Sequence, residues 1–198
     1  MLLTLLSILQ AIALDMLWSK SIAQMGPIEL TPLYITAVLQ ALATLLILIM
    51  VWTSFVSLLM RFVWIPSMLD TALPFLVGIL QFALIEHARP DRLGEWFILQ
   101  SALILVITYV THIYYKKARL DPENSEFFKS LSPATWRDMI PEFVWAFVAF
   151  VVGMAILMLD IDGWLKCATI VVVVSALAHF VIQQNKFWIK SFQSEGET

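Results

Sequence analysis

The chain has 198 residues, of which 61% are hydrophobic and only 14% are charged, whereas about 25% of residues are charged in a typical soluble domain. This composition predicts an integral membrane protein and leaves no large soluble domain. The net charge of −3 and the lack of a long Lys/Arg cluster argue against direct nucleic-acid binding, which needs a basic patch. A lone cysteine, Cys167, excludes an intrachain disulfide and a thiolate metal cage.

Six apolar segments follow one another along the chain. A helix needs about 20 apolar residues to cross the hydrocarbon core. The first segment lacks the positive region and cleavage site of a signal peptide, so we expect it to be retained. The predicted fold is all-α, a single transmembrane bundle of about six spans, or five or four if the first is interfacial or the third is re-entrant. The predicted spans are Leu2 to Trp18, Leu33 to Met60, Ser67 to Ile85, Trp96 to Tyr115, Phe143 to Leu159 and Trp164 to Ile182.

Basic residues near the span ends predict the orientation, because cytoplasmic loops carry an excess of Lys and Arg. The loop 116–142 contains five of them and is therefore expected in the cytoplasm. Because successive spans cross the membrane in opposite directions, both termini, Arg61 and the tail 183–198 are expected on the same side as this loop. That side then holds 8 of the 12 basic residues. Arg89 and Arg92 fall on the other side and count against this orientation. The expected location is the bacterial inner membrane.

The loop 116–142 carries signals for short helices. Asp121-Pro122 and Ser132-Pro133 each combine a capping side chain with a proline suited to the first helical position. Pro141 opens the fifth span in the same way. We therefore expect two short helices before that span begins.

Apolar side chains in this loop recur at helical spacing. Phe127, Phe128 and Leu131 are spaced i, i+1 and i+4, and a second apolar set begins at Trp136. Such helices lie on a membrane surface or bind a partner protein, and the sequence leaves both outcomes open. For a soluble cytosolic partner, the predicted docking residues are Phe127, Phe128, Leu131, Trp136 and Arg137.

Only two charged residues occur between Leu30 and Ile85, namely Arg61 at the end of the second span and Asp70 near the start of the third. If a helix begins at Pro66, Asp70 lies about 6 Å into it, which is interfacial depth. We expect an ion pair between Arg61 and Asp70 across the turn. The alternatives are an acidic group that lines an ion or proton path, and an N-cap or lipid-headgroup contact.

Two histidines fall near the same predicted depth. His112 lies at the inner end of the fourth span, and His179 lies near the inner end of the sixth. Together with Arg61 and Asp70 they define a candidate polar layer. Histidine titrates near neutral pH, so such a layer could gate, sense or conduct. The alternative is that both histidines are hydrogen-bonded residues of the interfacial belt.

One pair of small residues predicts close helix packing. Ala149 and Gly153 are four positions apart in the fifth span, and such pairs let two helix backbones approach closely. The short LDIDG turn predicts that the fifth and sixth spans form an antiparallel hairpin. The partner of the small face stays open between the sixth span and another subunit. Gln10, Gln40 and Gln100 are expected to link helices by hydrogen bonds.

Enzyme signatures are absent from the sequence. GxSxG, HExxH, a glycine-rich phosphate loop and CxxC do not occur. Cys167 and His179 are separated by about 18 Å along one helix, so they cannot form a dyad within the chain. We expect a protein that is not an enzyme and that needs no metal or cofactor.

Two resemblances bear on function. The stretch WIPSMLDTALPF at 64–75 resembles bacterial relatives of the lysosomal TMEM-type potassium channels, which have a tryptophan and a later Leu-Pro-Phe in this region. Their Phe-Ser-Asp motif is absent from the first segment, where LSILQAIAL stands. In form, as a multi-pass chain of this length with compact loops, the protein resembles the membrane subunit of the Kiwa antiphage system. That family pairs a membrane sensor with a soluble effector.

The sequence therefore predicts a non-enzymatic, oligomeric membrane protein that acts as a sensor or anchor for a soluble cytosolic partner. This interpretation depends on the lack of catalytic motifs and on the concentration of polar surface on one side. The alternative is a small ion channel or transporter whose path includes Asp70 and His179.

Overall fold

The computed structural model describes the backbone of residues 2–24, 30–63, 68–129, 136–159 and 161–193. All regular structure in these ranges is helical, which confirms the all-α prediction. The elements are α1 (Leu2–Gln24), α2 (Pro32–Arg61), α3 (Met68–Glu86), η1 (Pro90–Arg92), α4 (Leu93–Leu120), η2 (Pro122–Asn124), α5 (Ser125–Phe128), η3 (Trp136–Met139), α6 (Ile140–Met158) and α7 (Gly163–Gln193).

Five of these helices, α1, α2, α4, α6 and α7, are long and apolar enough to cross a membrane. The apolar part of α3 with described side chains, Ala72–Glu86, is about 22 Å long at 1.5 Å per residue, which is shorter than the ~30 Å hydrocarbon core. A membrane protein is therefore supported. The number of spans and their orientation stay predictions.

Prolines and capping side chains begin the helices where the sequence indicated. Asp121 accepts a hydrogen bond from the backbone N–H of Glu123 at 3.0 Å, next to Pro122. Pro141 lies in the first turn of α6, where its missing N–H removes no helical hydrogen bond. The predicted helix start at Ser132-Pro133 lies outside the described residues.

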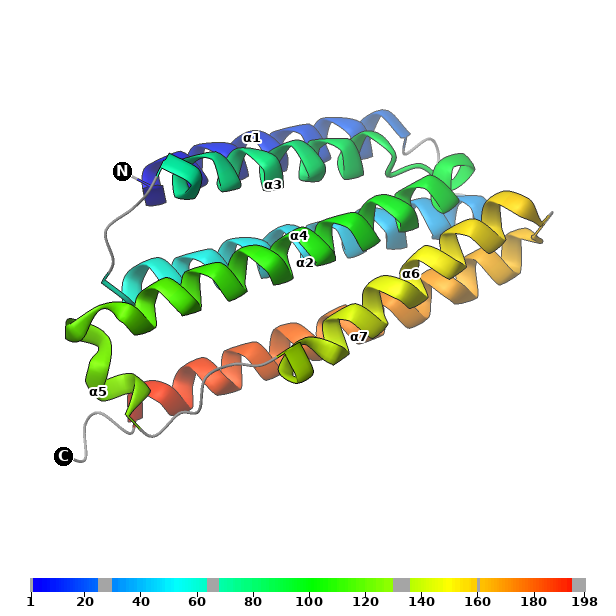
Figure 1. Cartoon of the computed structure of the whole chain (residues 1–198). Helices are drawn as coiled ribbons and strands as arrows, with labels where there is room; N and C mark the ends of the chain where they lie inside the picture. Colours follow the sequence, from blue (N-terminus) through cyan, green and yellow to red (C-terminus); the bar gives the residue numbers. More distant parts are fainter. Residues whose placement is uncertain (1, 25–29, 64–67, 130–135, 160, 194–198) are drawn as a thin grey trace.

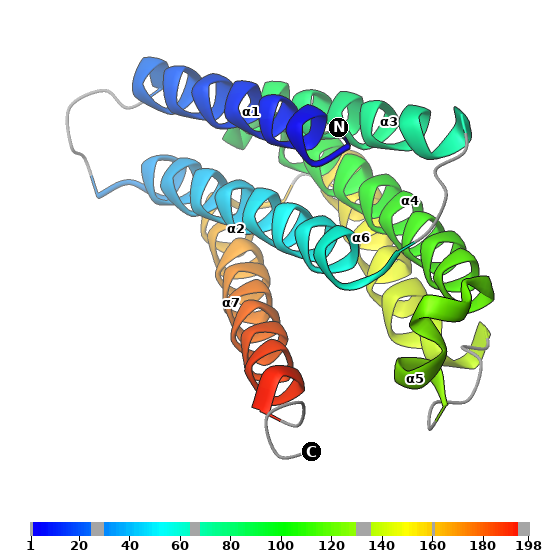
Figure 2. The same ribbon diagram turned by 90° about the vertical axis from the view of Figure 1, so that its left-hand side faces the viewer.

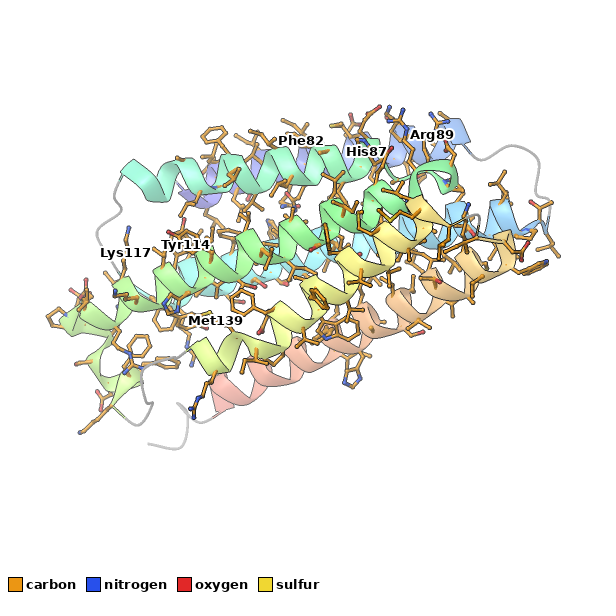
Figure 3. All side chains as sticks on the ribbon, turned by 45° about the vertical axis from the view of Figure 1, so that its right-hand side comes forward. Phe82, His87, Arg89, Tyr114, Lys117 and Met139 are labelled. Atoms are coloured by element: carbon orange, nitrogen blue, oxygen red, sulfur yellow. The ribbon has the colours of Figure 1, made fainter. Side chains whose placement is uncertain are left out.

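The long helices run alternately in opposite directions and form three layers (Figure 1). One layer contains α1 and α3, the middle layer contains α2 and α4, and the third contains α6 and α7. The start of α1, the end of α7 and α5 lie at the same end of the bundle, which we call the α5 end; the other is the opposite end. Figure 3 shows Lys117, Tyr114 and Met139 toward the α5 end, and His87 and Arg89 at the opposite end.

The last two long helices are antiparallel, as the short turn predicted, but they pack mainly on different neighbours. The principal neighbour of α6 is α4, and that of α7 is α2. Figure 2 shows α7 separating from α4 and α6 toward the α5 end. The hairpin is therefore splayed.

The small face of α6 meets α4. Ala149 and Gly153 are buried, and a Cβ placed on Gly153 would lie 2.7 Å from the carbonyl oxygen of Gly94. The sequence left the partner of this face open between the sixth span and another subunit. The structure assigns it to a third element, the start of α4, because Gly94 supplies the second surface without a side chain.

Buried polar side chains connect the layers. Gln10 of α1 donates a hydrogen bond to Gln81 of α3 at 2.9 Å, and Gln40 of α2 donates to the backbone oxygen of His87 at 3.3 Å. The fully buried indole of Trp96 donates to Thr44 at 3.1 Å. Of the three glutamines expected to link helices, Gln10 links α1 to α3, and Gln40 links α2 to the connection that follows α3. Each bond favours one alignment of the segments that it joins, because an unpaired polar group in an apolar interior is costly.

Charged side chains pair at the opposite end of the bundle. Lys20 of α1 lies 2.7 Å from Glu86 of α3, and His87 lies 3.3 Å from Glu95. Lys20 holds the pKa of the exposed Glu86 carboxyl below its ordinary value, because the ammonium donates a hydrogen bond to it and attracts its charge. The EHARPDR segment is thus a set of surface pairs between neighbouring helices.

Candidate functional site

The loop that follows α4 is attached to the bundle by one buried amide. Asn124 accepts a hydrogen bond from the backbone N–H of Val63 at 3.1 Å and donates to the carbonyl oxygen of Val63 at 2.6 Å. It also donates to the carbonyl oxygen of Ala118 at 2.8 Å. One side chain therefore joins the exit of α2 to the last turn of α4.

Aromatic rings complete this attachment. Phe62 stacks on Phe128 with ring centroids 5.3 Å apart, and it meets the edges of Phe127 and Tyr115 at 5.1 and 5.6 Å. Phe62 and Phe128 are buried. We call the four rings Phe62, Tyr115, Phe127 and Phe128 the aromatic junction. It joins α2, α4 and α5 at the α5 end of the bundle.

Two arginines cover the aromatic junction. The guanidinium of Arg61 lies 4.3 Å from the ring centroid of Phe127, and that of Arg119 lies 4.7 Å from the ring centroid of Phe128. A cation over an aromatic face is worth about 0.5 to 2 kcal/mol, more when water is excluded. Arg61 therefore has a stabilising role at this junction that the sequence did not reveal.

The predicted docking residues fall into different surroundings. Phe127 and Phe128 pack against helices of their own chain rather than forming an outward face. Arg137 is exposed. Leu131 lies outside the described residues, as does the side chain of Trp136. The exposed side chains of the described loop include Leu120, Glu123, Ser125, Glu126 and Lys129.

The residues of the predicted polar layer also differ in their surroundings. Arg61 lies on the aromatic junction, His112 lines the groove described next, and His179 is exposed on α7. Asp70 is in the first turn of α3, and its side chain lies outside the described residues, together with the predicted ion pair to Arg61. The interfacial depth of Asp70 stays a prediction.

A long apolar groove of about 850 Å³ lies between α2, α4, α6 and α7. It is lined by side chains within residues 47–54 of α2, 97–115 of α4, 139–152 at η3 and α6, and 169–180 of α7. The volume is within the range of ligand pockets in proteins. The splay of α7 from α6 opens this space, and no motif in the sequence signals it.

Polar side chains occur at two levels of the groove. Thr111, His112, Tyr115 and Glu142 line it toward the α5 end. Farther along α4, Gln100 is 6% exposed, and its Oε1 has no hydrogen-bond partner. Between these levels the α4 wall presents the apolar side chains of Leu103, Ile104 and Ile107, and the polar side chain of Thr108.

An aromatic contact closes part of the side between α6 and α7. Trp145 and Phe180 both line the groove and meet edge to face, with ring centroids 5.9 Å apart and ring planes at 79°. Each of the two residues is 39% exposed. The pair therefore bridges α6 and α7 beside the groove at this level.

In the described part of the chain, no group of three His, Cys, Asp or Glu residues could hold a metal ion. Cys167 is a buried free thiol. Comparison of the chain with protein-family models, with curated proteins and with solved structures found no match.

Proposed function

We propose that this chain is a non-enzymatic, multi-pass protein of the bacterial inner membrane that acts as a sensor or anchor for a soluble cytosolic protein. The loop 116–142 is the docking segment. The partner is a soluble effector, as the resemblance in form to the Kiwa membrane subunit implies. Self-association of the chain belongs to the same proposal.

The observation that carries this proposal is the attachment of the loop by Asn124. Its three hydrogen bonds, to Val63 and Ala118, fix the start of the loop to the ends of α2 and α4. A partner bound there would respond to a change in the packing of those helices. A loosely tethered loop would not transmit such a change.

The structure alters which residues we assign to docking. Phe127 and Phe128 are used within the chain, so the contact surface is formed by Leu120, Glu123, Glu126, Lys129 and Arg137, which are exposed. Leu120 is 79% exposed and would supply an apolar anchor within a charged surface. Interfaces between separately folded proteins combine an apolar core with a polar rim, and Leu120 with its charged neighbours has that arrangement.

The channel alternative gains no favouring observation among the described residues. Asp70 lies in the first turn of α3, and Arg61 is directed to Phe127. The space inside the bundle has mainly apolar walls. An ion path at membrane depth needs polar groups to replace the hydration shell.

Affinity purification from the native host tests the proposal. The wild-type chain should bring down a cytosolic protein in stoichiometric amount, and the double reversal Glu126→Lys with Lys129→Glu should release it. The reversal Asp91→Lys with Arg92→Glu changes two exposed residues at the opposite end and should leave the complex intact. Recovery of the chain alone, or equal loss in both reversals, would contradict docking at the loop.

A further inference from the structure

We propose that the groove between α2, α4, α6 and α7 binds one phospholipid with a primary-amine head group, such as phosphatidylethanolamine. An acyl chain lies along α4, and the head group lies toward the α5 end. This proposal stands on the groove alone and does not depend on the docking of a soluble partner.

The length of the apolar section fits one acyl chain. Gln100 and Thr111 lie at its two ends on α4, and Thr108 is the polar side chain of α4 that lines it between them. Gln100 and Thr111 are separated by about 16 Å at 1.5 Å per residue. The hydrocarbon core is about 30 Å thick, so one leaflet is about 15 Å deep. A chain from one leaflet would therefore fill the section between the two polar levels.

The shape of the groove also fits a chain rather than a compact ligand. The lining on α4 extends from Phe97 to Tyr115, which is about 27 Å along the helix. Spread over that length, the volume of about 850 Å³ corresponds to a slot with a mean cross-section of about 31 Å². Aliphatic walls such as Val51, Leu103 and Val173 match the apolar surface of an acyl chain.

The charges at the α5 end select the head group. Glu142 lines the groove there and supplies an acceptor for an ammonium group. His112, Tyr115 and Thr111 line it at the same end and carry groups able to donate hydrogen bonds to a phosphate. A zwitterionic head satisfies both sets, whereas an anionic head without an amine would supply no cation to offset the phosphate charge beside Glu142.

The position of the groove gives a lipid access to it. It lies between helices long and apolar enough to span a membrane, so its surroundings are acyl chains. The Trp145 and Phe180 rings, which meet at 5.9 Å between α6 and α7, form the barrier on that side. Separation of these two rings would admit a chain laterally.

Native mass spectrometry of the full chain, purified and exchanged into micelles with equal phosphatidylethanolamine and phosphatidylglycerol, tests the proposal. The wild type should retain one phosphatidylethanolamine. Val173→Trp fills the groove and should lower retention about tenfold, which corresponds to about 1.4 kcal/mol. Val171→Trp is the matched control, because Val171 is exposed and lies outside the lining.

A second pair of variants distinguishes loss of lipid binding from misfolding of the protein. Val152 lines the groove and Val151 is exposed outside it, so Val152→Trp should repeat the loss and Val151→Trp should not. Glu142→Gln should remove the preference for phosphatidylethanolamine over phosphatidylglycerol. Equal retention in the filled and control variants, a preference of the wild type for phosphatidylglycerol, or a lipid-free dimer that buries the groove would overturn the proposal.

Discussion

Gly94 and Gly153 approach so closely that neither has room for a side chain. A Cβ on Gly153 would lie 2.7 Å from the carbonyl oxygen of Gly94, and a Cβ on Gly94 would lie 2.9 Å from that of Gly153. Backbone is an obstacle in both cases and cannot rotate away as a flexible side chain can, and the side chain of Leu157 adds a second obstacle at Gly94. The crossing of α4 and α6 therefore depends on two glycines that are far apart in the sequence.

Gly153→Ala should destabilise the fold by about 1 to 3 kcal/mol, the usual cost of inserting a methyl group into a packed interface. Thermal unfolding in detergent, followed by circular dichroism, measures this effect as a lower Tm. Gly78→Ala is the matched control, because its Cβ would meet only the side chain of Leu9, at an ordinary 3.4 Å. If the two alanines shifted Tm equally, the close crossing would have no special cost.

Asn124→Ala should loosen the loop from the bundle. The substitution removes three hydrogen bonds to Val63 and Ala118, at about 1 kcal/mol each. Limited trypsin digestion should then cut faster after Lys129. Ser125→Ala alters an exposed neighbour and should leave the rate unchanged. An unchanged rate in Asn124→Ala would show that the aromatic junction holds the loop unaided.

Gln10 and Gln81 should be energetically coupled. Replacing either one by leucine leaves the other amide buried without its partner, so each single variant should be less stable than the wild type. The double leucine variant should recover stability, because no orphaned amide remains. A double-mutant cycle on Tm should give a coupling of about 0.6 kcal/mol, and strict additivity would argue against the bond.

The pair of Lys20 and Glu86 predicts a loss of stability in acid. Lys20 lowers the pKa of Glu86 from its ordinary value of 4.5, so the folded state binds the proton less readily than the unfolded state. The stabilisation is therefore complete above that ordinary value and disappears as pH falls through the lowered pKa. Tm measured from pH 6 to pH 3 should fall less in Lys20→Met. An identical slope in both proteins would exclude the pair as its cause.

Local sequence patterns were sufficient to predict the helices themselves. Each predicted span overlaps one long helix, since apolar runs and proline starts such as Pro122 and Pro141 are properties of neighbouring residues. The glutamine links were accessible for the same reason, because a lone amide in an apolar run needs a partner.

Contacts between distant residues were not accessible from such patterns. The spacing of Phe127 and Phe128 marks an apolar face, but it does not identify Phe62 as the surface that covers it. Gly94 lacks a small neighbour four positions away, so nothing in α4 alone marks it as the partner of Gly153. The groove was missed because it depends on the divergence of α6 and α7, which only the packed bundle determines.

The close crossing of α4 and α6 provides a pivot point far from the loop 116–142. Ile140, the first residue of α6, is about 20 Å from Gly153 along the helix. A tilt of α6 by about 5° at the two glycines would displace that end by about 1.7 Å over this 20 Å arm. A small tilt of α6 at Gly94 and Gly153 would thus move the segment that precedes Ile140, at the far end of the helix.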